Sequence, residues 1–160
     1  SGFVRLSTFT DYSLRVLIYL AAEPTRRATI AEVAATFEVS ENHLTKVVHF
    51  LGQQGWVATV RGKGGGLALA QEPAGIVVGE VVRLTEGEAM PAECFDKEHN
   101  TCTIARACRL QGVLREAAEA FQSVLERYTL ADLVHNRATL SRMLFIDRVR
   151  PDTAVRRAAS

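Results

Sequence analysis

Residues 29–70 read "TIAEVAATFEVSENHLTKVVHFLGQQGWVATVRGKGGGLALA", and their pattern predicts two short helices followed by a β-hairpin. The first helix, 29–37, opens with a capping box formed by Thr29 and Glu32. Ser40 is placed to cap a second helix over 41–55, which Gly55 can end. The residues that would face inward from this second helix are Leu44, Val47, Val48 and Leu51. Two short helices joined by such a turn form a helix-turn-helix, whose second helix is the candidate reader of the DNA major groove.

The segment after the second helix predicts a wing. Val57–Val60 and Leu67–Ala70 are short β-prone runs on either side of the glycine-rich loop "RGKGGG". Upstream, residues 10–22 carry apolar residues at helical spacing, with Thr8 or Thr10 as the expected cap and Asp11 in the first turn. Three helices followed by a hairpin make a winged helix-turn-helix. The expected fold class is therefore mainly α with a small β-hairpin wing.

Charge along the chain points to DNA as the partner. The net charge is only +1, but no Asp or Glu lies between Glu41 and Glu72. An acid-free, basic surface on a balanced chain is typical of a nucleic-acid contact. A winged helix used only for protein contacts is the alternative. The residues expected to contact double-stranded operator DNA are Ser40, Asn42, His43, Thr45, Lys46, His49, Arg61, Lys63 and Gly64.

The segment 110–128 predicts a long helix with one apolar stripe. The stripe comprises Leu114, Ala117 or Ala118, Phe121, Val124 or Leu125, and Tyr128. A long helix appended to a small domain has little of its own chain to cover such a stripe, so we expect it to pair with a second subunit in a homodimer. The predicted layout is a DNA-binding domain over 5–80, a cluster-binding loop and linker over 81–112, a dimerisation helix with short C-terminal helices over 113–147, and a disordered tail over 148–160.

Composition excludes several classes of protein. The chain has 160 residues, 48% of them apolar, and no apolar run of the length that a bilayer requires. We therefore expect a cytoplasmic protein without membrane contact. No arrangement of acid–base or nucleophilic residues emerges, so the chain is not expected to be an enzyme.

All three cysteines lie in one segment, "ECFDKEHNTCTIARACRL", residues 93–110. Cys94, Cys102 and Cys108 are separated by seven and then five residues, without the close Cys pairs that structural zinc sites use. Such spacing suits a loop around something larger than one ion, and thiolates bind iron–sulfur clusters. Three thiolates leave one iron to another ligand, for which His99, Asp96, Glu98 and Asp11 are candidates. Two alternatives remain at this point. The cysteines could bind zinc together with His99, or all three could be unligated.

Four separated motifs resemble the NsrR-type nitric-oxide-sensing repressors, which belong to the wider Rrf2-like family of winged-helix iron–sulfur regulators. They are "RLSTFTDYSLRVLIYLA" at 5–21, "RGKGGGLALA" at 61–70, "CTIARACRL" at 102–110 and "YTLADLV" at 128–134. The resemblance, over about residues 5–147, implies a homodimeric repressor whose iron–sulfur cluster controls operator binding and whose nitrosylation relieves repression. It also implies a [4Fe–4S] cluster on Cys94, Cys102 and Cys108, with Asp11 of the other subunit as fourth ligand.

Two departures from related patterns bear on the ligands. IscR-like relatives use a histidine three residues after the last cysteine, where this chain has Gln111, which counts against [2Fe–2S] ligation of that type. The long first gap between cysteines leaves His99 as a competitor of Asp11. An iron- or redox-sensing regulator of the same fold, and a zinc-bound or cluster-free DNA-binding protein, are the alternative functions.

Overall fold

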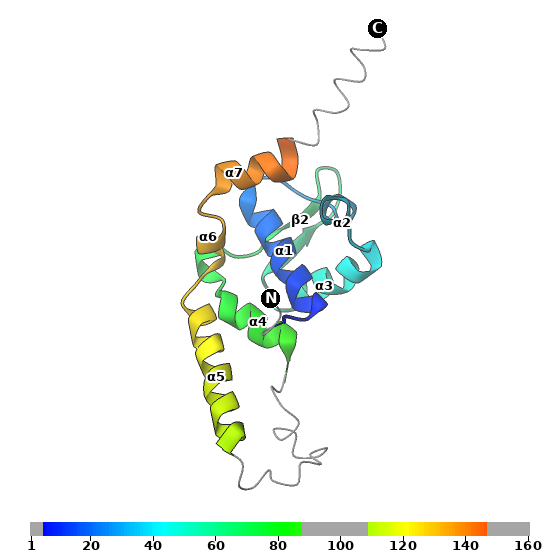
Figure 1. Cartoon of the computed structure of the whole chain (residues 1–160). Helices are drawn as coiled ribbons and strands as arrows, with labels where there is room; N and C mark the ends of the chain where they lie inside the picture. Colours follow the sequence, from blue (N-terminus) through cyan, green and yellow to red (C-terminus); the bar gives the residue numbers. More distant parts are fainter. Residues whose placement is uncertain (1–4, 88–108, 147–160) are drawn as a thin grey trace, which may run out of the picture.

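The computed structural model describes residues 5–87 and 109–146, and it is mainly helical with one two-stranded antiparallel sheet (Figure 1). The described helices and strands, in chain order, are α1 (Thr8–Ala22), α2 (Ile30–Phe37), α3 (Glu41–Gln53), β1 (Val57–Val60), β2 (Gly66–Leu69), the short 3-10 turn η1 (Pro73–Gly75), α4 (Val78–Glu86), α5 (Arg109–Glu126), α6 (Leu130–Leu133), α7 (Arg137–Ser141) and the π-helical turn η3 (Arg142–Ile146). The predicted fold class is confirmed. The three cysteines, His99 and the predicted tail lie outside the described residues.

Helix α1 begins earlier than the sequence suggested, and its cap differs. Ser7 is the N-cap, and its hydroxyl accepts a hydrogen bond from the backbone N–H of Thr10 at 3.2 Å. The expectation that Thr8 or Thr10 caps the helix is wrong. Thr10 is instead fully buried, and its hydroxyl donates to the hydroxyl of Thr85 in α4 at 2.8 Å. A threonine used to join two helices is not available as a cap.

The helix-turn-helix forms as its local signals predicted. Thr29 and Glu32 make the capping box of α2, and Ser40 caps α3 through the backbone N–H of His43. Glu38 ends α2 in the left-handed region, with φ 54°, and Gly55 turns the chain after α3 with φ 79°. The four apolar residues expected to face inward from α3 are all buried. Local capping therefore fixes the length and separation of both helices.

The wing is held against the loop between α1 and α2. Val57 pairs with Leu69 and Val60 with Gly66, so β2 begins one residue earlier than predicted. Ala28 forms an isolated bridge to Leu67, with N–H···O distances of 3.2 and 2.6 Å. Gly66 has φ 140°, and a Cβ there would lie 2.7 Å from the Ala28 carbonyl oxygen. Only glycine fits at this position, where the wing and the loop meet.

The core is centred on α1, which runs through the middle of the molecule (Figure 1). Its Val16, Leu17 and Leu20 are buried with residues of α2, α3, β2, α4 and α6. At the far end of the chain, Phe145 packs edge-on against Tyr19 of α1 at 4.9 Å between ring centroids. None of the described helices combines the length and apolar character needed to cross a membrane.

Helices α4 and α5 cross closely at Gly79. A Cβ on Gly79 would lie 2.7 Å from the backbone nitrogen of Glu126 and 2.8 Å from its Cα. The side-chain amide of Gln122 donates to the carbonyl of Gly79 at 2.7 Å. The absence of a side chain at Gly79 thus allows α5 to dock closely on α4.

Replacing Gly79 with alanine is expected to lower the free energy of unfolding by about 1–3 kcal/mol or more, because the new methyl group meets backbone that cannot turn aside. The matched control is Gly112→Ala in α5, where the added Cβ would meet nothing within 4 Å. That change should stabilise the helix by up to about 1 kcal/mol. Urea unfolding of both variants measures the difference, and equal stabilities would contradict the close crossing.

Candidate functional site

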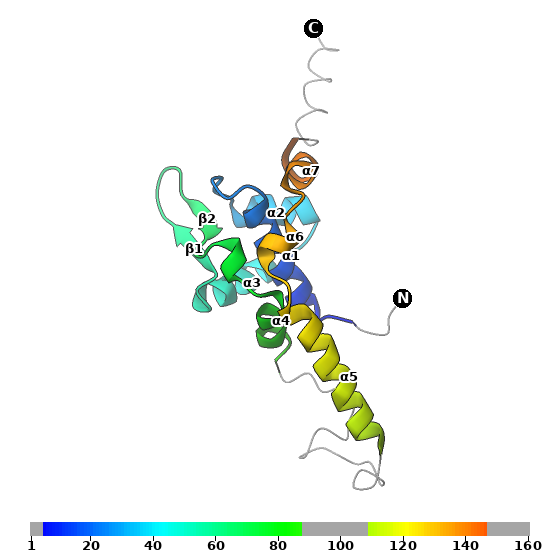
Figure 2. The ribbon, with the colours of Figure 1, turned by 90° about the vertical axis from the view of Figure 1, so that its left-hand side faces the viewer.

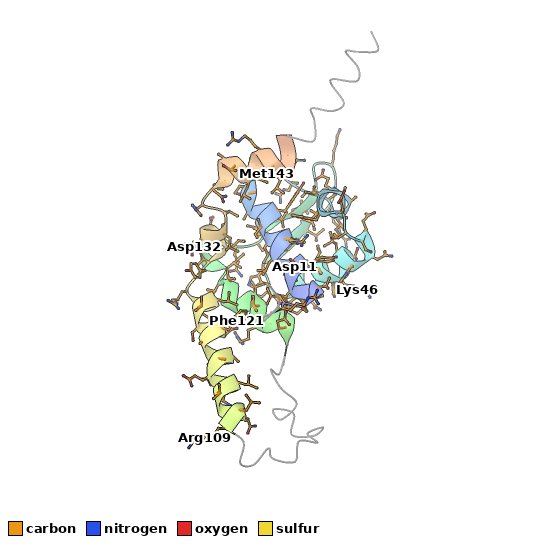
Figure 3. The ribbon with its side chains drawn as sticks, viewed as in Figure 1. Asp11, Lys46, Arg109, Phe121, Asp132 and Met143 are labelled. Atoms are coloured by element: carbon orange, nitrogen blue, oxygen red, sulfur yellow. The ribbon has the colours of Figure 1, made fainter. Side chains whose placement is uncertain are left out.

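The outward surface of α3 carries three polar side chains in one row. Asn42, Lys46 and His49 are exposed and lie four and then three residues apart, which places them on one face of the helix. Figure 3 shows Lys46 pointing away from the body of the molecule. These side chains combine a cation with hydrogen-bonding groups, the chemistry that phosphates and base edges require.

The other three candidates on α3 have local roles. The Ser40 hydroxyl caps the helix, and the Thr45 hydroxyl donates to the carbonyl of Glu41 at 2.8 Å. His43 is half-buried, and its ring lies 4.8 Å from the ring of Tyr12 in α1. These three residues shape the recognition surface in addition to any contact with DNA.

The wing loop presents its cations to solvent on a glycine framework. Arg61, Lys63 and Gly64 are all exposed. Gly62 and Gly64 have φ values of 96° and 76°, and a Cβ on Gly65 would lie 2.2 Å from the carbonyl oxygen of Val60. The loop is therefore tight and thin, a shape that suits insertion into the minor groove.

Asp11 sits in the first turn of α1 with its carboxylate paired to Arg15, one turn further along the helix. The Arg15 guanidinium donates to both carboxylate oxygens at 3.0 Å, and the Asp11 side chain is 43% exposed. The same guanidinium lies 5.9 Å from the centre of the Tyr12 ring and 5.7 Å from that of Phe37. The Asp11 carboxylate is thus accessible to solvent. Its orientation is fixed by Arg15, whose guanidinium also lies near the rings of Tyr12 and Phe37.

The first turn of α1 also lies against the end of α4. The backbone N–H of Ser7 donates to the Glu86 carboxylate at 2.6 Å, beside the bond between Thr10 and Thr85. Burial raises the pKa of Glu86, but hydrogen bonds from Thr10 and Ser7 outweigh it and the net pKa is lowered. The bond therefore stabilises the fold above the ordinary carboxyl pKa, and this contribution is lost as pH falls through the lowered value. Since α4 ends at Glu86, the first turn of α1 lies against the last turn of α4.

The predicted metal ligands are not brought together within the described residues. Cys94, Cys102 and Cys108 lie outside them, and residues 5–87 and 109–146 contain no group of three or more His, Cys, Asp or Glu side chains placed to hold a metal. The donor types nevertheless fit an iron–sulfur cluster, because three thiolates suit its soft irons and an accessible carboxylate can serve as a weaker fourth ligand. Asp11 is the one predicted ligand whose surroundings the structure describes.

An exposed apolar stripe runs along α5, which extends away from the rest of the described chain (Figures 1 and 2). No residue of α5 is buried. The exposed large side chains are Leu110, Val113, Phe121 and Val124 on α5, and Tyr128 just after its end. Leu114 and Leu125 from the predicted stripe are half-buried, so the exposed stripe is narrower than the sequence suggested. A contiguous apolar surface of this kind marks an interface.

Two residues near the site were missed from the sequence. Arg15 could have been identified because it follows Asp11 at the spacing that favours an ion pair on a helix. The second missed residue is Tyr12. Its contact with His43 depends on how α1 crosses α3, and no local sequence pattern predicts that crossing.

Comparison with known families and proteins gives a consistent match. The profile of the Rrf2 family, described as an iron-dependent transcriptional regulator, matches residues 6–136. The HTH-type transcriptional regulator NsrR of Bacillus subtilis is 49% identical over 142 residues, which cover 88% of this chain and 97% of that protein. NsrR of Shouchella clausii is 48% identical over 142 residues, covering 88% of this chain and 95% of that protein.

Two solved structures share the fold of this chain. CymR, the global cysteine regulator of B. subtilis, aligns with a TM-score of 0.65 and 28% identity, covering 84% of this chain and 98% of that one. IscR of T. potens aligns with a TM-score of 0.68 and 25% identity, covering 84% of this chain and 88% of that one.

Proposed function

Because this chain belongs to the Rrf2 family of iron-dependent transcriptional regulators, we propose that it is a homodimeric repressor that binds operator DNA and responds to nitric oxide. Its sensor would be an iron–sulfur cluster, most simply [4Fe–4S], and loss of cluster integrity would relieve repression. The protein would act in the cytoplasm. The observation that carries the proposal is an exposed polar face of α3 beside a cationic wing, on a chain 49% identical to a regulator named NsrR.

DNA binding is supported by how the two cationic elements are held. Helix α3 would enter the major groove with Asn42, Lys46 and His49, and the wing would place Arg61 and Lys63 at the adjacent minor groove. Because only Gln54, Gly55 and the buried Trp56 lie between α3 and β1, the two elements are linked by a short connection. A rigid pair of this kind can hold a fixed register on the duplex.

Dimer formation is supported by the exposed stripe of α5. The aromatic and aliphatic side chains of this stripe would be costly to leave in water, and a second copy of the same helix supplies a matching surface. Two recognition helices on a two-fold axis would read two half-sites about one turn of DNA apart.

Asp11, Cys94, Cys102 and Cys108 are the proposed cluster ligands, with Asp11 contributed by the partner subunit as the family resemblance implies. A cluster on these ligands supplies iron that reacts with nitric oxide, and a carboxylate-bound iron is its least protected position. His99, which lies outside the described residues, is the alternative fourth ligand. The pair between Asp11 and Arg15 means that an iron bound to Asp11 competes with the guanidinium for the carboxylate.

Helix α1 offers a direct route from Asp11 to the DNA surface. Phe9, two residues before Asp11, packs against Phe50 near the end of α3 at 5.4 Å between ring centroids. Tyr12, directly after Asp11, contacts His43 near the beginning of α3. The turn that carries Asp11 therefore contacts both ends of α3, and a shift of this turn would move the recognition helix.

The proposed function is tested by the effect of nitric oxide on DNA binding. Protein purified without air would first select binding sequences from a library of random duplexes, and the recovered duplexes would then serve as probes. We expect a shared palindromic sequence and a marked loss of affinity when nitric oxide is added. Recovery of no sequence, or affinity that nitric oxide leaves unchanged, would contradict the proposal.

Lys63→Ala is expected to weaken binding to specific and non-specific duplexes alike, because an exposed wing lysine contacts phosphate rather than a base. The slope of log affinity against log salt should fall in magnitude by about one for each subunit, and therefore by about two for the dimer. Fluorescence anisotropy across a salt series measures both effects. A slope equal to that of the unmodified protein would argue against contact between the wing and DNA.

A further inference from the structure

The loop between α1 and α2 carries two adjacent arginines in different circumstances. Arg26 is exposed but has partners within the chain: its guanidinium lies 4.4 Å from the centre of the Phe145 ring and 3.9 Å from the Glu32 carboxylate. Arg27 is exposed and forms no ion pair within residues 5–87 and 109–146. An exposed arginine without an acidic partner is available to bind an anion.

The backbone around Arg27 is fixed to the wing. The bridge between Ala28 and Leu67 joins the loop to β2, directly beside Gly66. A Cβ added to Gly66 would lie 3.3 Å from the Cβ of Arg27, so the stem of the arginine borders the wing backbone. Gly66 pairs with Val60 and closes the loop 61–65 that carries the wing cations. Arg27 therefore stands at the root of that loop, beside the pair formed by Gly66 and Val60.

We infer that Arg27 binds a DNA phosphate next to the wing, which makes the loop between α1 and α2 a third DNA-contacting element after α3 and the wing. An arginine guanidinium binds phosphate with paired hydrogen bonds, and such a contact positions the protein without reading sequence. The two backbone hydrogen bonds between Ala28 and Leu67 restrain the backbone next to Arg27, so the cation is presented from a held position. This inference rests on the proposed function, since it requires that α3 and the wing bind DNA.

Arg27→Gln should lower the magnitude of the salt slope by about two, because each subunit of the dimer loses one phosphate contact, and should weaken affinity by roughly tenfold per contact at about 0.1 M salt. The probe is a fluorescein-labelled mixed-sequence duplex of about 25 base pairs, long enough for two half-sites. The protein is the full chain, purified without air and confirmed as folded by circular dichroism. Arg27→Lys keeps the charge and should recover most of the slope.

The matched control is Arg127→Gln, which removes the same charge from an exposed position between Phe121 and Asp132. Figure 3 shows those two residues on the opposite side of the molecule from Lys46. The control should bind like the unmodified protein. A slope for Arg27→Gln equal to that of the unmodified protein overturns the inference, while a slope near zero for the unmodified protein refutes DNA binding itself. The two failures are thus distinguishable.

Discussion

Phe121→Asp is expected to convert the protein from a dimer to a monomer and to reduce operator affinity by about 100-fold or more. Phe121 lies within the exposed stripe of α5, 36% exposed between Val113 and Val124. A carboxylate there would be buried without a partner if two copies of the helix met, which the interface cannot tolerate. Operator binding falls because two linked recognition helices are replaced by one. Analytical ultracentrifugation and anisotropy measure the two effects.

The control for this change is Ser123→Asp, two residues away on α5. Ser123 is exposed but lies on the opposite side of the helix from Phe121. The introduced charge is the same, so effects of net charge on DNA binding appear equally in both variants. We expect the control to remain dimeric. A dimeric Phe121→Asp protein would show that α5 does not form the subunit interface.

Asp11→Ala is expected to abolish stable cluster retention, or to remove the response to nitric oxide, while leaving the fold intact. The pair with Arg15 is partly exposed and lies on one helix, so its loss should cost no more than about 0.5 kcal/mol. Loss of the favourable charge in the first turn adds at most about 1 kcal/mol. A large drop in bound iron therefore cannot be attributed to unfolding. Iron content and the visible absorbance of anaerobically purified protein provide the measurement.

The companion variant His99→Ala separates the two candidate ligands. If Asp11 is the fourth ligand, His99→Ala retains iron and Asp11→Ala does not. The reverse result would assign the position to His99. Retention of cluster and response in both variants would contradict a fourth protein ligand at either position.

Much of the DNA-binding part could be predicted because its signals are local. The capping box at Thr29, the cap at Ser40 and the glycine after α3 define two helices within a few residues of each signal. The wing was also predictable, because β-prone runs flank a loop rich in glycine. Each of these features depends on backbone hydrogen bonds that neighbouring residues supply.

Features that depend on contacts distant in sequence could not be predicted in the same way. Thr10 looks like a cap in the sequence, but the bond to Thr85 takes its hydroxyl into the core. Arg26 and Arg27 look equivalent, and only the packing of Phe145 and the bridge to Leu67 separates them. Leu114 and Leu125 belong to the apolar pattern of α5 but are half-buried. The neighbouring face of the helix, which carries Gln122, docks on Gly79. The role of Thr10, the partners of the two arginines and the exposed face of α5 all depend on how distant segments pack together. Local sequence patterns do not predict that packing.

The central claim is that three cysteines and one oxygen or nitrogen ligand hold a nitric-oxide-sensitive iron–sulfur cluster. The most direct measurement is the iron and sulfide content of protein purified without air, combined with the absorbance spectrum during titration with nitric oxide. We expect a brown protein with about four irons per subunit whose absorbance bleaches as nitric oxide is added. A colourless protein that contains zinc, or no metal at all, would contradict it.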